Sequence, residues 1–336
     1  MTDGALFSLV MATYGRSEEL KPALASLIEQ TDRGFELIVV DQNKDERIAP
    51  LLESVRAAGI SVNHVRLDVA NLSLARNVGL QHANGRIVAF PDDDCWYEPD
   101  VIASVRAAFA ANDAIDGIVA RWCEVEKKGD RPAAPLSSVA WRRFRAGDAT
   151  SFTLFFMLER LKAMGGFDPR LGTGRWFGCG EETDLILRML GEGRRIDYLP
   201  AARIHHPHAE WPSATKAQCR RERMYGRGTG ALYVKHGLPV WVAARGFVGP
   251  LTRVHRAPKL AAGLLLAGCT ILGRMEGVVG WWLGSRMATV GRRQAGVRFR
   301  SVKRQRHASK QRGKGHDLQD AGLGRCSHRR PQKCAC

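Results

Sequence analysis

Short apolar runs alternate with amphipathic segments along the first half of the chain. Three runs, Leu6–Ala12, Phe35–Asp41 and Arg86–Phe90, are predicted to be buried strands because their apolar positions are nearly continuous. Segments with apolar residues at helical spacing lie between them, near Ala49–Ala58 and Asn71–Asn84. Strands that alternate with helices predict an α/β fold, with a mostly parallel sheet covered by helices on both faces.

Polar residues directly follow or end the predicted strands. Thr13 and Tyr14 follow the first strand, Asp41 ends the second, and Asp92–Asp94 follow the strand at Arg86–Phe90. The carboxyl ends of parallel strands meet at one edge of a sheet, and such folds bind their ligands there. We therefore expect these side chains to line one crevice.

The three consecutive carboxylates of Asp92, Asp93 and Asp94 are the most informative feature of the sequence. Like charges packed this closely repel one another, so a cation is expected to offset them. Oxygen ligands suit Mg²⁺ or Mn²⁺, especially an ion shared with a substrate phosphate. A solvated acidic turn is the usual alternative for such a triplet, and the position at a strand end favours the metal site.

The positive charge of the chain is concentrated near its C-terminus. Of the formal net charge of +17, residues 286–336 carry +13, from 15 lysines and arginines against two aspartates, which leaves +4 for residues 1–285. This segment is poor in apolar residues and is predicted to be disordered. It is compatible with contact to anionic lipid or nucleic acid, or with no function, and no specific nucleic acid is expected as a partner.

The eight cysteines are scattered, with no CxxC pair, so their spacing indicates neither a zinc framework nor a disulfide scaffold. A reducing, cytoplasmic setting fits this pattern.

The segment Leu238–Gly284 is apolar and rich in tryptophan. Its first apolar run, Leu260–Gly273, stops at Arg274, short of the roughly twenty residues that a membrane span needs. A second run follows at Gly277–Leu283. This interruption favours a buried helix pair, or helices that lie along the membrane surface, over a true span.

Five segments, in the same order, resemble those of family 2 glycosyltransferases of the GT-A fold. Ser8–Arg16 is similar to the first strand and nucleotide-binding turn of that family, and Glu36–Asp41 is similar to its second strand. Ala75–Gly79, which precedes the aspartates, is similar to the approach to the family's DxD motif. Gly165–Asp168 and Gly180–Asp184 are similar to its acceptor-side segments.

The resemblance implies an inverting, metal-dependent enzyme that moves a sugar from a nucleotide-diphosphate donor to a glycan or lipid-linked acceptor. It implies that Asp41 bonds the nucleobase and that Tyr225–Gly228 is a mobile loop over the donor. Arg76 either meets the donor or forms a salt bridge from its helix to a carboxylate. The expected ligands of Mn²⁺ or Mg²⁺ are Asp92, Asp94 and His206. The residues expected to bind the donor are Thr13, Tyr14, Arg16, Asp41, Arg76, Asp92, Asp93 and Arg227.

An inverting transfer also needs a base that deprotonates the acceptor hydroxyl. The family usually has Glu-Asp where this chain has Glu181-Glu182, so Glu182 is the expected base, with Glu181 and Asp184 as the other candidates. Acidic residues in a first helical turn are also favoured by the helix dipole alone. Trp176 and Trp211 are candidates for an acceptor groove, with core packing as the alternative.

Two other functions remain open. A nucleotidyltransferase that makes sugar nucleotides would need a glycine-rich basic loop after the first strand, and Ala12–Arg16 contains one glycine. A non-enzymatic protein that binds membrane or nucleic acid through its basic tail is the second alternative. The expected organisation is a GT-A domain at residues 1–236, an apolar helical region in contact with the cytoplasmic face of the membrane at 237–285, and a basic disordered tail at 286–336.

Overall fold

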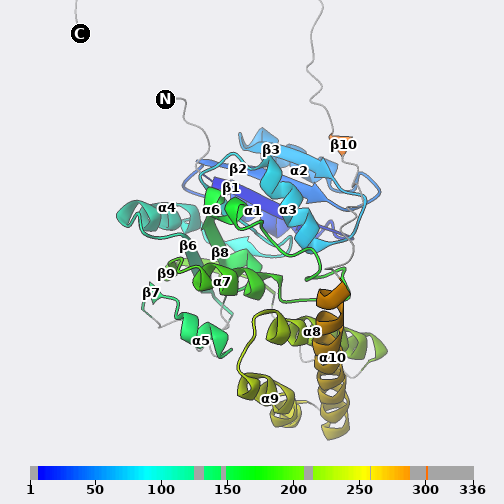
Figure 1. Cartoon of the computed structure of the whole chain (residues 1–336). Helices are drawn as coiled ribbons and strands as arrows, with labels where there is room; N and C mark the ends of the chain where they lie inside the picture. The colour runs from blue at the N-terminus through cyan, green and yellow to red at the C-terminus, as the bar shows by residue number, and fades with distance from the viewer. Residues whose placement is uncertain are drawn as a thin grey trace, which may run out of the picture. The chain divides into compact units, whose positions relative to one another are not determined.

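A computed structural model of the protein describes residues 7–124, 132–144, 149–207, 215–257, 259–287 and 300–301. Figure 1 shows a twisted sheet flanked by helices, followed by a helical C-terminal part. Trp211 and nearly all of the predicted tail at 286–336 lie outside the described residues.

One sheet runs through the α/β part. Its strands are β1 (Phe7–Thr13), β2 (Phe35–Asp41), β3 (Ser61–Arg66), β4 (Ile87–Ala89), β5 (Trp96–Tyr97), β6 (Gly117–Trp122), β7 (Ala134–Pro135), β8 (Leu154–Met157), β9 (Ile196–His205) and β10 (Arg300–Ser301). The strands β3, β2, β1 and β4 are neighbours in that order and are all parallel. The prediction of a parallel sheet is confirmed for this half. The second half is mixed, because β8 runs antiparallel to β4 and β6, whereas β6 and β9 are parallel.

Helices cover both faces of the sheet. They are α1 (Leu20–Ile28), α2 (Ala49–Ala57), α3 (Leu72–His82), α4 (Val101–Ala111), α5 (Ser138–Arg142), α6 (Leu158–Ala163) and α7 (Glu181–Gly191). Successive side chains of a strand point to opposite faces. Accordingly Leu9 and Met11 of β1 pack with α1, α2 and α4, whereas Val10 packs with α3, α6 and α7.

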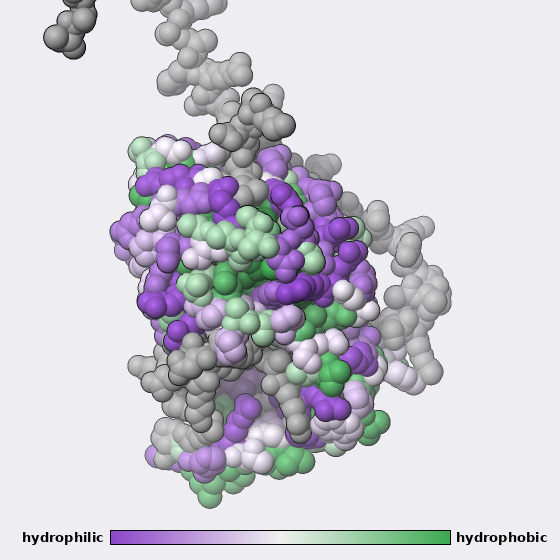
Figure 2. Space-filling model, turned by 90° about the vertical axis from the view of Figure 1, so that its left-hand side faces the viewer, coloured by the Kyte–Doolittle hydropathy of each residue, from purple (hydrophilic) through white to green (hydrophobic). Residues whose placement is uncertain are grey.

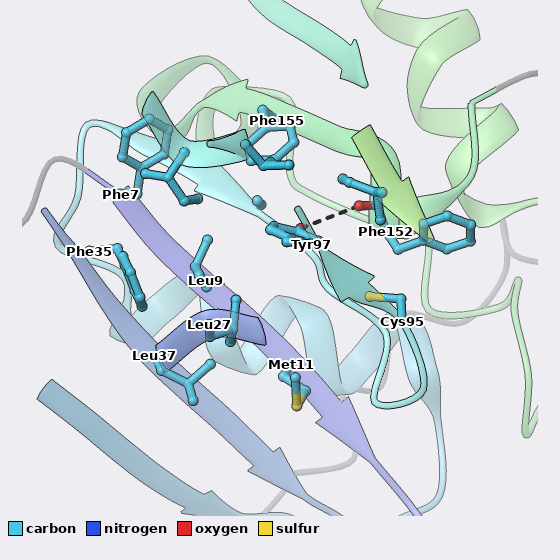
Figure 3. Close-up of a cluster of buried hydrophobic side chains, with 14 of the residues drawn as sticks. Phe7, Leu9, Met11, Leu27, Phe35, Leu37, Cys95, Tyr97, Phe152 and Phe155 are labelled. Carbon is cyan, nitrogen blue, oxygen red and sulfur yellow. Dashed lines mark hydrogen bonds between the residues drawn. The ribbon is translucent and has the colours of Figure 1, made fainter. Parts of the chain in front are cut away.

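Figure 3 shows the first of these two cores, where Phe7, Leu9 and Met11 of β1 lie beside residues of β2 and α1. Tyr97 of β5 is buried in the same core, and its hydroxyl donates a hydrogen bond to the carbonyl of Phe152 (3.3 Å). This bond connects the segment after the aspartates to the segment before β8, so the core holds these two segments together.

The C-terminal part consists of α8 (Lys216–Lys235), α9 (Val240–Val248), a 3₁₀ helix (Leu251–Arg256) and α10 (Leu260–Met287). The helix α10 lies along α8, and glycines of both helices form the contact. A Cβ added at Gly226 or Gly230 of α8 would meet the backbone of α10, and one added at Gly273 or Gly277 of α10 would meet the backbone of α8. Each helix therefore carries two glycines four residues apart, a spacing that lets two backbones approach closely.

Two sequence predictions for this part are wrong. Tyr225–Gly228 is not a loop, because it lies inside the continuous helix α8, where Gly226 makes room for α10. The apolar helix does not stop at Arg274, because α10 continues through that residue to Met287. By length and composition alone, Leu260–Gly284 could cross a membrane. It has 25 residues, and 28% of its apolar 18-residue window is buried in the structure.

Candidate active site

The polar residues at the ends of β1 and β4 lie together, as the parallel order requires. The hydroxyl of Thr13 donates to Oδ2 of Asp93 at 2.7 Å. Nη1 of Arg16 lies 2.5 Å from a carboxylate oxygen of Asp93 and 2.5 Å from one of Asp94. The middle aspartate is thus held by the turn after β1.

The other two aspartates meet a histidine from the end of β9. One ligand atom from each of Asp92, Asp94 and His206 lies within 4.8 Å of the others. Nε2 of His206 is 3.2 Å from Oδ1 of Asp94, while Nδ1 is 2.9 Å from the carbonyl oxygen of Pro207. Because a carbonyl only accepts, Nδ1 carries a proton and Nε2 is the nitrogen directed at the carboxylates.

Burial and charge act in opposite directions on these groups. Burial raises the pKa of Asp92, and the charge of Arg76 only partly opposes this. Burial also acts to raise the pKa of Asp94, but the hydrogen bonds and charges of His206 and Arg16 together outweigh it, so that pKa is lowered. Two oxygen ligands and one imidazole in this arrangement fit a divalent cation, which would offset the charge that burial makes costly.

Arg76 of α3 connects this group to the second cluster of carboxylates. Its side chain is almost completely buried, at 1% exposure. Nη2 donates to Oδ1 of Asp92 and Nη1 donates to Oε1 of Glu181, both at 3.0 Å. Arg76 therefore forms the salt bridge that was the second of its two expected roles.

Glu181 and Glu182 lie in the first turn of α7, which begins after Gly180 in the left-handed conformation (φ 92°). Burial and the neighbouring charge of Glu181 raise the pKa of Glu182 well above its ordinary value. Oε2 of Glu182 is buried and has no hydrogen-bond partner within the part of the chain that the structure describes. The hydrogen-bonding capacity of this oxygen is thus unused among the described residues, whereas Glu181 already binds Arg76.

Asp184, the third acidic candidate, is fully buried. Its carboxylate contacts Arg188 (3.0 Å), Lys235 (2.6 Å) and His236 (2.9 Å). Asp184 therefore joins α7 to the C-terminal end of α8, and its carboxylate is already engaged by three cationic or polar side chains.

At the end of β2, Asp41 is fully buried and is held by Arg66 (2.6 Å) and His64 (3.0 Å). Its Oδ1 also accepts a bond from the side chain of Asn43. Tyr14, by contrast, is 61% exposed. Asp41 thus shapes the loop after β2, beside an exposed aromatic ring.

Arg227 lies on α8. Its Nε is 2.7 Å from Oε2 of Glu276 on α10, and its guanidinium lies 4.7 Å from the ring centre of Trp176. Trp176 is 46% exposed and lies between this helix pair and Phe177. The described contacts of Arg227 are thus with α10 and Trp176, and none is with the aspartates.

Sequence reasoning missed two residues of the site. The hydroxyl of Ser151 lies 3.2 Å from Oδ1 of Asp92, and the ring of Phe152 stacks on His206 at 4.9 Å between centres. Both belong to a short 3₁₀ helix before β8. No motif in the sequence marks this helix, and only the antiparallel pairing of β8 with β4 brings it to the aspartates.

Known proteins are similar to this chain in sequence and in fold. A family model described as glycosyl transferase family 2 matches residues 8–159. The chain is 31% identical over 97 residues to the Escherichia coli protein UDP-Glc:alpha-D-GlcNAc-diphosphoundecaprenol beta-1,3-glucosyltransferase WfgD, covering 28% of this chain and 37% of that protein. It is 27% identical over 251 residues to the succinoglycan biosynthesis protein ExoM of Rhizobium meliloti, covering 68% of this chain and 76% of ExoM. Matches to three further curated relatives span only 14%, 32% and 35% of their lengths.

Among solved structures, the fold is similar to that of the mannosyltransferase PcManGT from Pyrobaculum calidifontis in complex with GDP-Man and Mn²⁺. The TM-score is 0.53 at 16% identity, and the match covers 86% of this chain and 77% of that chain. At this identity the similarity concerns the fold alone. Residues 8–159 therefore match the model of glycosyl transferase family 2, and the fold is of the GT-A type seen in these solved glycosyltransferases.

Proposed function

We propose that this protein is a metal-dependent, inverting glycosyltransferase that uses a nucleotide-diphosphate sugar as donor. The observation that carries the proposal is the position of Arg76, which bonds Asp92 of the expected metal group on one side and Glu181, the neighbour of Glu182, on the other. A donor diphosphate at the metal group and an acceptor hydroxyl at Glu182 would then lie on opposite sides of the Arg76 guanidinium.

Asp92, Asp94 and His206 are the proposed ligands of Mn²⁺ or Mg²⁺. When bound, such an ion would stabilise the diphosphate leaving group through its positive charge. The donor set supports this, because two carboxylates and one imidazole nitrogen face one another within 4.8 Å. PcManGT, of similar fold, was crystallised with GDP-Man and Mn²⁺.

The donor would lie along the ends of β1, β2 and β4. Tyr14 offers an exposed ring for the nucleobase, and Asp41 keeps the adjoining loop in place. Thr13 and Arg16 hold Asp93, which would face the ribose or the sugar. Arg227 is a less direct candidate, since its guanidinium is engaged by Glu276.

Glu182 is the proposed base. Of the three acidic candidates it alone has a buried oxygen without a partner among the described residues, and its raised pKa suits a group that must take a proton near neutral pH. Glu181 is neutralised by Arg76, and Asp184 by Lys235 and Arg188. These two residues would position α7 rather than accept the proton.

The acceptor is proposed to be a glycan or a lipid-linked sugar, presented at a membrane surface by α9 and α10. Figure 2 shows apolar residues gathered at the lower end of the molecule, where α9 lies in Figure 1. The large exposed apolar side chains of this part are Val240, Trp241, Val248, Leu251, Leu260, Leu264, Leu265, Leu272, Met275, Val279, Trp282 and Leu283. Burial of such side chains in the interfacial region drives membrane binding.

Thermal unfolding of the full-length protein with a panel of nucleoside diphosphates, with and without Mn²⁺, tests the donor and the metal together. We expect one nucleotide to raise the Tm only when Mn²⁺ is present, and Asp94→Asn to remove that shift. Proton NMR of the product then reports whether the anomeric configuration inverts. The proposal fails if no nucleoside diphosphate stabilises the protein or if the product retains the configuration of the donor.

Cosedimentation of full-length protein with vesicles that contain anionic lipid tests the membrane contact. We expect Trp241→Glu combined with Leu265→Glu to weaken binding, because both side chains are about half exposed. Extraction with carbonate would release a protein that lies on the surface. Retention in the membrane would instead indicate that α10 spans it.

A further inference from the structure

A second cluster of metal-ligating side chains lies at the ends of three strands in the mixed half of the sheet. Glu98 follows β5, Cys123 follows β6, and His205 ends β9. One ligand atom of each lies within 4.8 Å of the other two. The three strands are neighbours, with β9 between β6 and β5, so the sheet itself brings these residues together.

The imidazole of His205 is oriented as in a metal site. Its Nδ1 lies 2.8 Å from Oε1 of Glu124, and its Nε2 lies 3.2 Å from Oε1 of Glu98. Metal-binding histidines characteristically donate their other ring N–H to a carboxylate, which fixes both the tautomer and the ring. The ring also stacks on Trp96, at 5.4 Å between centres and an interplanar angle of 2°.

One thiol, one imidazole and one carboxylate form a donor set that is unlike the group at Asp92. A sulfur ligand favours a borderline-soft ion over Mg²⁺ or Mn²⁺, and three protein ligands leave a fourth position open in a tetrahedral site. We propose that Glu98, Cys123 and His205 bind Zn²⁺, with Glu124 as the partner that orients His205. None of these four residues is assigned a direct part in the proposed transfer reaction.

The charges around the cluster are compatible with a bound cation. Glu98 and Glu124 are both carboxylates, and among the described residues Arg203 pairs with the first of them, with its Nε 2.9 Å from both oxygens of Glu98. The Arg203 side chain is about half exposed, at 49%, so it can turn to solvent when a metal takes its place. The rival explanation is an ion-paired cluster in which Arg203 and a protonated His205 neutralise the two glutamates without metal.

Occupancy of this site has a structural consequence for the first one. His205 and His206 are consecutive, so a metal held by His205 would fix the chain from which His206 approaches Asp94. It would also tie the ends of β5, β6 and β9 to one another. We therefore expect Zn²⁺ to stabilise the fold rather than to take part in transfer.

Titration of the full-length protein with Co²⁺ as a spectroscopic probe tests the proposal. A thiolate ligand gives a sulfur-to-cobalt charge-transfer band, which the sulfur-free group of Asp92, Asp94 and His206 cannot produce. We expect the band in the wild type and in Asp92→Asn, and its loss in Cys123→Ser. Cys219→Ser, which changes a half-buried cysteine of α8, is the matched control and should keep the band.

Glu124→Gln distinguishes a metal site from an ion-paired cluster, because it keeps the size of the side chain and leaves all three ligands in place. We expect it to weaken Co²⁺ binding by about 10–100-fold, as for other residues that orient a ligand. Glu98→Gln should weaken binding as well, and it tests the site even if Cys123→Ser fails to fold. A wild-type protein without the band at saturating Co²⁺, or a band that persists in Cys123→Ser, would overturn the proposal.

Discussion

Nη2 of Arg76 lies 3.0 Å from Oδ1 of Asp92. Arg76 belongs to α3, whereas Asp92 lies after β4, the next strand along the chain. The other nitrogen of the same guanidinium binds Glu181. A planar, bidentate cation can serve two carboxylates at once, which a lysine cannot do with the same geometry. The expected metal group and Glu181, the neighbour of the expected base Glu182, therefore share one buried charge.

The first prediction concerns this shared charge. We expect Arg76→Met to lower the free energy of unfolding by about 3–5 kcal/mol, because it removes the buried guanidinium that pairs with both Glu181 and Asp92. Arg76→Lys should recover part of the stability but little of the transfer activity. Urea unfolding gives the stability, and Arg106→Gln, which breaks a partly exposed pair with Asp32, is the control that should cost less than about 1 kcal/mol.

The second prediction concerns the metal. Removal of divalent ions with EDTA should stop sugar transfer, and Mn²⁺ or Mg²⁺ should restore it. His206→Ala should raise the Mn²⁺ concentration needed for half-maximal activity, because it removes one of the three proposed ligands, while Asp94→Asn should leave activity near background. Full activity of the EDTA-treated wild type would rule out the proposed role of this group.

The third prediction follows from the buried carboxyl of Glu182. Burial and then the charge of Glu181 raise its pKa well above the ordinary value of 4.5. Since the base must be ionised, kcat should fall on the acid side with an apparent pKa above 4.5, and activity should increase as the pH rises through that value.

Glu182→Gln should reduce kcat by about 10²–10⁴-fold, remove the acid limb and leave donor binding intact. Glu181→Gln is the matched control, because it makes the same carboxylate-to-amide replacement at the adjacent residue. If the Glu181 variant loses the acid limb and the Glu182 variant keeps it, the two roles are reversed.

Much of the site could be predicted from the sequence because its parts are local. Polar residues at the ends of continuous apolar strands are bound to share an edge of a parallel sheet, and Thr13 and Asp93 do contact each other there. The contact of Arg76 with Glu181 joins positions 105 residues apart, and its geometry depends on how α3 and α7 pack against one face of the sheet. No local pattern carries that information.

The same limit explains the errors in the C-terminal part. The family resemblance predicted a mobile loop at Tyr225–Gly228, and its two glycines are unfavourable in an isolated helix. In this protein their missing side chains allow α10 and the chain at Cys179 to approach the backbone of α8. Likewise Arg274 and Glu276 interrupted the apolar pattern, yet Glu276 is neutralised by Arg223 and Arg227 of α8, so the helix continues.

The last prediction tests this helix contact. A Cβ added at Gly277 would lie within 3.0 Å of the carbonyl oxygen of Arg227, which is backbone and cannot turn away. We expect Gly277→Ala to destabilise the protein by about 1–3 kcal/mol through overpacking, and to separate α10 from α8. Gly268→Ala, on the same helix with open space around it, should instead stabilise the helix by about 0.5–1 kcal/mol, since alanine is the better helix former. Thermal unfolding of both variants under identical conditions distinguishes two explanations. If only helix propensity changes, the Tm of both variants should rise. If the two backbones are closely packed at Gly277, the Tm should fall for Gly277→Ala alone.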